Sequence, residues 1–283
     1  MTGASRRGLV AALAVALPVL AGAGYSLLAS LGLTGAGSVG GGPARFAAVL
    51  GESVVWTGLA WSLWIAAAST ALAAGGAVTV AALFRREAGL DRAARLFAVL
   101  PLPIPHLAAA VAGLLLLGQS GLLARLLASL GLLTDPGGMP ALVYDRAGLG
   151  LILTLAWKEF AFLALVALSV VATRGERLEE VARTLGAKPV AVFRRVTWPL
   201  LWRGLLPAVV AAFVFVASTY EAAAVLAPSD PLALPLLTLE RYTDADLSRR
   251  GDAFVLVLLG MMVSLLAVAA HEWARSRWDR FEP

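Results

Sequence analysis

A polar, helix-forming segment lies between the fourth and fifth apolar stretches of this chain and reads Leu178-Glu179-Glu180-Val181-Ala182-Arg183-Thr184-Leu185-Gly186. Its apolar residues recur at helical intervals and share one face, whereas its charged residues point elsewhere. Gly186 stands where the helix must end in a left-handed or tightly packed backbone, and Pro199 follows thirteen residues later. This spacing is typical of a docking element.

The composition around this segment is that of an integral membrane protein. Of the 283 residues, 60% are hydrophobic and only 14% are charged, against about 25% charged in soluble domains. The absence of cysteine excludes disulfides and thiolate metal sites, and two histidines argue against a histidine metal site, so no metal or cofactor is expected. Basic loops of a membrane protein account for the net charge of +5, so no nucleic-acid partner is expected.

Six apolar stretches are long enough to cross a bilayer, which needs about 20 residues per helix. They are Gly8–Leu33, Thr57–Phe84, Leu96–Gly118, Ala147–Ala172, Gly204–Ala227 and Ala253–His271. The fold class predicted is therefore an all-α membrane protein with six transmembrane helices. The first stretch also resembles a signal peptide, but its length favours an uncleaved helix. The shorter segment Gln119–Leu133 is predicted to form an interfacial or gate-packing helix on the outer side.

Basic residues predict the orientation of these helices. One set of loops carries Arg6, Arg7, Arg85, Arg86, Arg92, Arg95, Arg174, Arg177, Arg183, Lys188, Arg194, Arg195, Arg203, Arg275, Arg277 and Arg280. The opposite set carries only Arg45, Arg125, Arg146, Arg241, Arg249 and Arg250. Because cytoplasmic loops are enriched in arginine and lysine, both termini and the loop with Glu180 are expected to be cytoplasmic.

The polar segment has a recognisable spacing. It reads Glu180-Val181-Ala182, three residues, Gly186, nine residues, and Val196-Thr197-Trp198-Pro199. This resembles the EAA signature (Glu-Ala-Ala, three residues, Gly, nine residues, Ile-x-Leu-Pro) of the permease subunits of binding-protein-dependent ABC importers of type I. Val181, Val196 and Trp198 replace Ala, Ile and Leu of the signature, which are apolar-for-apolar exchanges. A solvated amphipathic helix on the bilayer surface would not explain the positions of Gly186 and Pro199.

The resemblance implies the type I ABC importer transmembrane fold and a multi-pass location in the bacterial inner membrane. Its partners would be two ABC ATPase subunits, a second permease subunit (identical or paralogous), an extracytoplasmic substrate-binding protein and the lipid bilayer. The implied divisions are 1–56 for the first helix and periplasmic loop, 57–271 for the core with a coupling loop at 173–203, and 272–283 for a cytoplasmic tail. The residues implied in ATPase coupling are Glu179, Glu180, Ala182, Leu185, Gly186 and Pro199, the two glutamates pairing with arginines of the ATPase.

The chain itself is not expected to be an enzyme. A phosphate-binding loop needs Gly-Lys followed by Ser or Thr, and the two lysines follow Trp157 and Ala187 instead. Nucleotide hydrolysis would therefore belong to a separate polypeptide.

Ionisable residues inside predicted spans form a second candidate site. Lys158, Glu159 and Glu221 either line a translocation path or pin helices together, because an unpaired charge in hydrocarbon is costly. His106 is interpreted as a helix-packing residue. Ser218 followed by Glu221 is similar to a stretch in polyamine, ferric-iron, sulfate and thiamine permeases. The alternative function is a secondary transporter that uses Lys158, Glu159 and Glu221 as an ion relay. The substrate stays open, since the acids favour a cation and Lys158 an anion.

Overall fold

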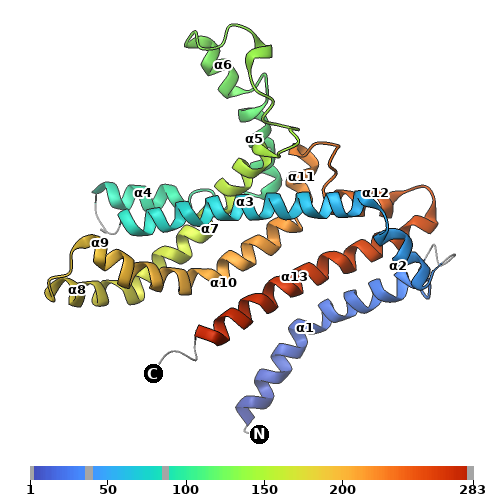
Figure 1. The fold of residues 1–283 in the computed structure, drawn as a ribbon, viewed down its shortest axis with the longest axis horizontal. Coiled ribbons are helices and arrows are strands. Elements are labelled where there is room, and N and C mark those ends of the chain that lie inside the picture. The colour runs from blue at the N-terminus through green and yellow to red at the C-terminus, as the bar shows by residue number, and fades with distance from the viewer. Residues whose placement is uncertain (1–2, 36–40, 85–88, 279–283) are drawn as a thin grey trace. The chain divides into compact units, whose positions relative to one another are not determined.

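A computed structural model describes residues 3–35, 41–84 and 89–278, and all of its regular structure over those ranges is helical (Figure 1). The all-α prediction is confirmed. The chain forms two compact units, one of residues 1–59 and 234–265 and one of residues 60–233 and 266–283. Arg85, Arg86 and Arg280, which contributed to the predicted orientation, lie outside the described residues.

The first unit contains α1 (Gly3–Ser30), α2 (Pro43–Leu50), α12 (Leu234–Thr243), η4 (Leu247–Arg249) and the first parts of α3 (Ser53–Leu83) and α13 (Arg250–Trp278). Aromatic contacts join three of these helices. The ring of Phe254 on α13 meets Tyr25 of α1 and Tyr242 of α12 edge to face, at centroid distances of 5.5 and 6.0 Å. Edge-to-face contacts stabilise the packing of such rings beyond the contribution of their buried area.

Two buried arginines hold this first unit together. Arg45 of α2 pairs with Asp252 at 3.3 Å and donates to the carbonyl of Ser30 at 3.1 Å. Arg241 of α12 donates to the carboxylate of Glu52 at 3.1 Å. The hydrogen bond from Arg241 lowers the pKa of Glu52 below its ordinary value. Buried charges are tolerated only when paired in this way, so the two arginines act as cross-links between helices.

The second unit holds the remaining helices around α7 (Leu149–Val170). These are α4 (Gly89–Val99), α5 (His106–Leu117), α6 (Leu122–Ser129), α8 (Glu176–Thr184), α9 (Pro189–Val192), α10 (Trp198–Ala217) and α11 (Glu221–Leu226), with the short turns η1 (Pro136–Gly138), η2 (Val171–Gly175) and η3 (Phe193–Thr197). Helix α7 packs against α4, α5 and α10, and α11 packs against α5. Figure 1 shows α6 extending away from α7 and α10.

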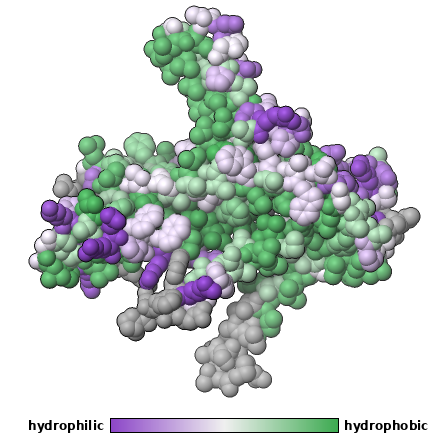
Figure 2. Space-filling view, in the orientation of Figure 1, coloured by the Kyte–Doolittle hydropathy of each residue, from purple (hydrophilic) through white to green (hydrophobic). Residues whose placement is uncertain are grey.

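Six helical stretches among the described residues are long and apolar enough to cross a membrane. They are Leu13–Ser30, Ser53–Leu83, His106–Ser129, Leu149–Thr173, Pro189–Ala217 and Leu247–Arg277. The number agrees with the prediction of six spans. The surface along the long helices is mostly hydrophobic in Figure 2, as lipid contact requires.

Two of the predicted spans are interrupted. The third, Leu96–Gly118, breaks between α4 and α5 at Pro101–Pro105, where prolines lack the backbone N–H that a continuous helix needs. The fifth, Gly204–Ala227, begins earlier, at Trp198, and breaks after Ala217. There the Ser218 hydroxyl donates to the carbonyls of Val214 and Phe215 at 3.0 and 3.1 Å, which also accept from the Ser218 backbone N–H.

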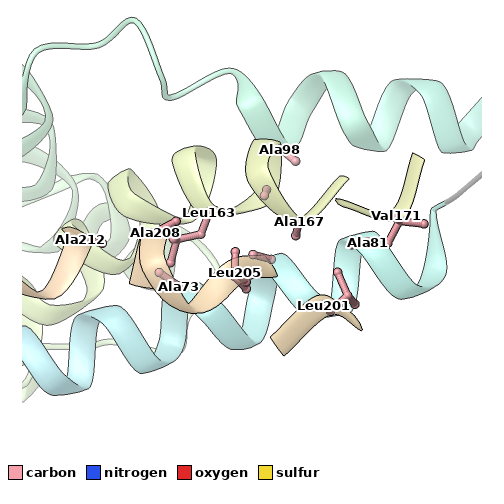
Figure 3. Packing of buried hydrophobic residues seen from close by; sticks show 12 residues of the cluster. Ala73, Ala81, Ala98, Leu163, Ala167, Val171, Leu201, Leu205, Ala208 and Ala212 are labelled. Atoms are coloured by element: carbon pink, nitrogen blue, oxygen red, sulfur yellow. The ribbon is translucent and has the colours of Figure 1, made fainter. Parts of the chain in front are cut away.

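Small residues let the central helices of the second unit approach closely. The core joins α3, α4, α7 and α10 through Ala73, Ala77, Ala81, Ala98, Leu163, Ala164, Ala167, Val171, Leu201, Leu205, Ala208 and Ala212 (Figure 3). A Cβ at Gly76 of α3 would lie 2.9 Å from the Phe160 ring of α7. Packing of this kind replaces the hydrophobic effect as the main attraction between helices in lipid.

Candidate coupling site

The polar segment sits between two π-helical turns. η2 follows α7 directly, and η3 leads into α10, so each turn joins the segment to a membrane span. Figure 1 shows α8 and α9 together at one end of α7 and α10, and hydrophilic residues gather at that end in Figure 2. Single π-helical turns are rare and frequently mark functional sites.

Helix α8 ends at Gly186 in the manner predicted. Gly186 has φ +81°, in the left-handed region that favours glycine. Its N–H donates to the carbonyl of Arg183 at 2.9 Å, and the N–H of Ala187 donates to the carbonyl of Ala182 at 3.0 Å. This pair of bonds is a Schellman motif, which satisfies free carbonyls at the end of a helix. The conformational part of the Gly186 prediction is therefore confirmed.

The apolar face of α8 points away from the rest of its own unit. Leu178, Val181 and Leu185 are 52%, 57% and 82% exposed, and Val190 of α9 is exposed as well. Ala182 is half-buried, and Glu180 is exposed. Exposed apolar side chains that are grouped together mark an interaction surface. We call Leu178, Val181 and Leu185 the apolar face of the coupling segment.

Glu179 is bonded within its own unit, whereas it was expected from the sequence to pair with an arginine of the ATPase. Its side chain is buried, and its carboxylate accepts a hydrogen bond of 2.5 Å from the Thr197 hydroxyl and one of 3.1 Å from Arg183. Thr197 is buried as well. The charged face of α8 is thus divided, because Glu180 faces outward while Glu179 is held inside the unit.

Pro199 is the second residue of α10, where its missing N–H costs no helical hydrogen bond. Beside the Glu179 pair runs a groove of about 600 Å³ between the end of α3 and the α9–η3 segment. Its walls include Val78 and Leu83 on one side and Val190 and Phe193 on the other. Helix α8 contacts η2, α9 and η3, and Glu179 and Arg183 of α8 also line the groove.

The intramembrane residues separate into two kinds. Lys158 and Glu159 of α7 are both buried within the unit. Lys158 Nζ donates to the Leu102 carbonyl at 3.3 Å, and Glu159 Oε1 lies 3.0 Å from His106 Nε2. The His106 ring also packs on Phe215, with centroids 4.7 Å apart. These contacts tie α7 to the proline-rich segment and to the start of α5.

Ser218 and Glu221 lie instead at the break between α10 and α11, and both are exposed. Glu221 opens the first turn of α11, where a negative charge faces the helix N-terminus favourably. The sequence did not predict the partners of Lys158 and Glu159, which are Leu102 and His106. The one available signal was the position of His106 directly after the proline cluster.

The fold and the exposed segment define a multi-span subunit of a membrane transport system. A family described as the binding-protein-dependent transport system inner membrane component matches residues 73–280, and the chain belongs to this family. It is the permease of a type I ABC importer and a multi-pass protein of the bacterial inner membrane.

Two groups of known proteins resemble the chain. The molybdenum transport system permease protein ModB of Mycobacterium tuberculosis is 32% identical over 79% of this chain and 81% of its own length. A probable molybdenum ABC transporter permease of Haloferax volcanii is 30% identical over 84% and 82%. Two crystal structures of a bacterial alginate ABC transporter match with TM-scores of 0.67 and 0.71 at 16% and 15% identity. They cover 86% and 94% of this chain and 85% and 93% of their own chains, and they show the fold.

Proposed function

We propose that the coupling segment transmits ATP-driven movement from a separate ATPase to the membrane spans of this importer permease. The observation that carries this proposal is the exposed apolar face of α8, held between two spans by the turns η2 and η3. Burying such a face in a groove of the ATPase would be favourable at about 25 cal/mol per Å² of apolar surface. Glu180 and Gly186 of the same segment are also exposed.

The proposed assembly has two ATPase subunits and a second permease subunit, fed by an extracytoplasmic binding protein. Within this chain, 57–271 form the transport core and 173–203 the cytoplasmic coupling loop. Residues 1–56 supply the first helix and periplasmic loop, and 272–283 form a cytoplasmic tail. One of the solved alginate transporter structures is a complex with a substrate-bound periplasmic protein, which supports a binding-protein partner of the same general kind.

The polar residues divide between two proposed roles. Ser218 and Glu221 are exposed at a helix break, which suits a place on the translocation path between two permease subunits. Lys158 and Glu159 are buried against Leu102 and His106, which suits helix packing. The secondary-transporter alternative would require these buried groups to exchange ions with water, and their internal contacts do not favour it.

The cargo proposed is molybdenum as its oxyanion. The support is the identity of the two relatives, both described as molybdenum permeases and both aligned over about four fifths of this chain. The acidic side chain of Glu221 does not select an anion, so selectivity is assigned to the binding protein rather than to the membrane path.

The test is co-purification of this chain with the ATPase subunit of its transporter, comparing wild type with Leu185→Glu. A charge at Leu185 would have to be buried at the contact, so the variant is expected to lose most of the captured ATPase. Leu132→Glu is the matched control, since Leu132 is a similarly exposed leucine in the loop after α6. If wild type captures no ATPase, or if both variants capture it equally well, the proposed coupling surface is wrong.

A further inference from the structure

One buried hydrogen bond joins the coupling helix to the membrane span that follows it. Glu179 is 3% exposed and Thr197 is 1% exposed, and the bond between their side chains is 2.5 Å long. The two residues are eighteen positions apart in sequence. Glu179 lies in the middle of α8, and Thr197 is the last residue of η3, immediately before the first residue of α10.

The bond is of a strong kind. A hydrogen bond to an ionised carboxylate is shorter and about twice as strong as one between neutral groups. A buried carboxylate also needs partners, because leaving it unsatisfied costs the full desolvation penalty of the charge. Thr197 supplies one partner, and Arg183, one turn along α8, supplies another at 3.1 Å. The arrangement therefore favours one orientation of α8 over others.

The contact continues into α10 through aromatic rings. Trp198, the residue after Thr197, lies 6.4 Å from Phe193 of η3 and stacks on Trp202 at 5.9 Å with an interplanar angle of 18°. Phe193 precedes Trp198 across the π-helical turn, and Trp202 lies one turn further along α10. The three rings therefore form a row of contacts that runs from η3 into α10.

We infer that Glu179 is a positioning residue, whose bond to Thr197 makes α8 and the start of α10 move as one lever. This inference rests on the proposed function, because a lever matters only if α8 docks on an ATPase. It assigns Glu179 a role different from that of Glu180. Glu180 would contact the ATPase, whereas Glu179 would link the movement of α8 to that of α10.

The experiment uses the complete transporter in proteoliposomes and measures substrate accumulated per ATP hydrolysed. Thr197→Val keeps the shape of the side chain and removes the hydroxyl, and Thr197→Ser restores it. Thr57→Val is the matched control, because the exposed Thr57 hydroxyl bonds carbonyls of its own helix. The melting temperature and the amount of captured ATPase are measured on the same samples.

Thr197→Val is expected to capture ATPase and hydrolyse ATP but to transport about tenfold less substrate per ATP, the size of effect that loss of one hydrogen bond to a charged group produces. Thr197→Ser and Thr57→Val are expected to match wild type. The inference is overturned if Thr197→Val transports normally, or if it loses only melting temperature while the ratio stays unchanged. Failure of wild type to capture ATPase would instead overturn the proposed function, so the two failures are distinguishable.

Discussion

The N–H of Ala187 donates to the carbonyl of Ala182 across the end of α8, 3.0 Å away. This bond forms only because Gly186 between them takes a positive φ of 81°. The end of the coupling helix and the apolar face beside it therefore depend on a residue whose own side chain is a hydrogen atom.

Replacing Gly186 with leucine is expected to uncouple ATP hydrolysis from transport while the protein still folds and inserts. No atom of the described residues lies within 4 Å of a Cβ at this position, so the direct cost is the strained φ, about 1 kcal/mol. The added side chain would project beside Leu185, where the ATPase is proposed to dock. Transport per ATP in proteoliposomes is the measurement.

Gly186→Asn serves as the control for that variant, since asparagine tolerates the left-handed region better than other residues. It is expected to retain more coupling than Gly186→Leu. Normal transport by Gly186→Leu would count strongly against the lever.

Gly76→Leu is expected to lower the stability of the second unit. Its Cβ would lie 2.9 Å from the Phe160 ring, and overpacking of this kind costs about 1–3 kcal/mol. Gly75→Leu on the same helix is the matched control, because a Cβ there meets no atom within 4 Å. Thermal unfolding in detergent compares the two variants, and an equal loss of melting temperature in both would contradict the packing described.

Acidification is expected to weaken the first unit through Glu52. The Arg241 hydrogen bond lowers the pKa of Glu52 in the folded protein, so its contribution to stability is present above the unfolded carboxyl pKa of about 4. The contribution disappears as the pH falls through the lower folded pKa. Melting temperatures measured from about pH 6 to about pH 3 are expected to fall more steeply for wild type than for Glu52→Gln.

Glu52→Gln is still expected to lose some melting temperature on acidification, because other carboxylates also have a lowered pKa. The backbone N–H of Asp246 donates to the Asp244 carboxylate at 2.9 Å and is the main cause that lowers the pKa of Asp244. Identical slopes for wild type and Glu52→Gln would show that the Glu52–Arg241 pair contributes nothing measurable.

Glu159 and Glu221 are expected to respond differently to substitution. Glu159→Leu leaves the half-buried His106 ring without its carboxylate partner, which should cost about 1–3 kcal/mol of stability. Glu221→Gln should leave the melting temperature unchanged and alter transport, because Glu221 is exposed at the helix break. Melting and uptake measured on both variants test this division. A stable Glu159→Leu variant that fails to transport would move Glu159 to the path.

Sequence periodicity predicted the parts of the site that depend on local structure. The spacing of Leu178, Val181 and Leu185 indicated one apolar face, and the turn at Gly186 required a glycine. The bond between Glu179 and Thr197 was not foreseen, because helical periodicity assigns a residue to a face and does not identify a contact eighteen residues away.

The interruptions of the third and fifth spans were missed for a similar reason. Hydropathy sums apolar character over a window and does not detect whether the backbone hydrogen bonds continue. The prolines at 101–105 interrupt the third span, and α10 ends at Ala217 inside the fifth apolar stretch, so both spans were wrongly predicted as continuous.

A cross-link from the apolar face of α8 shows whether this helix docks on the ATPase. The chain contains no cysteine, so Leu185→Cys carries a unique thiol that can be labelled with a photoactivatable, thiol-reactive cross-linker in the assembled transporter. Leu132→Cys, after α6, is the control. We expect an adduct between this chain and the ATPase from Leu185→Cys alone, with a yield that changes on adding nucleotide. An assembled, ATP-hydrolysing complex that yields no ATPase adduct from Leu185→Cys would contradict this docking.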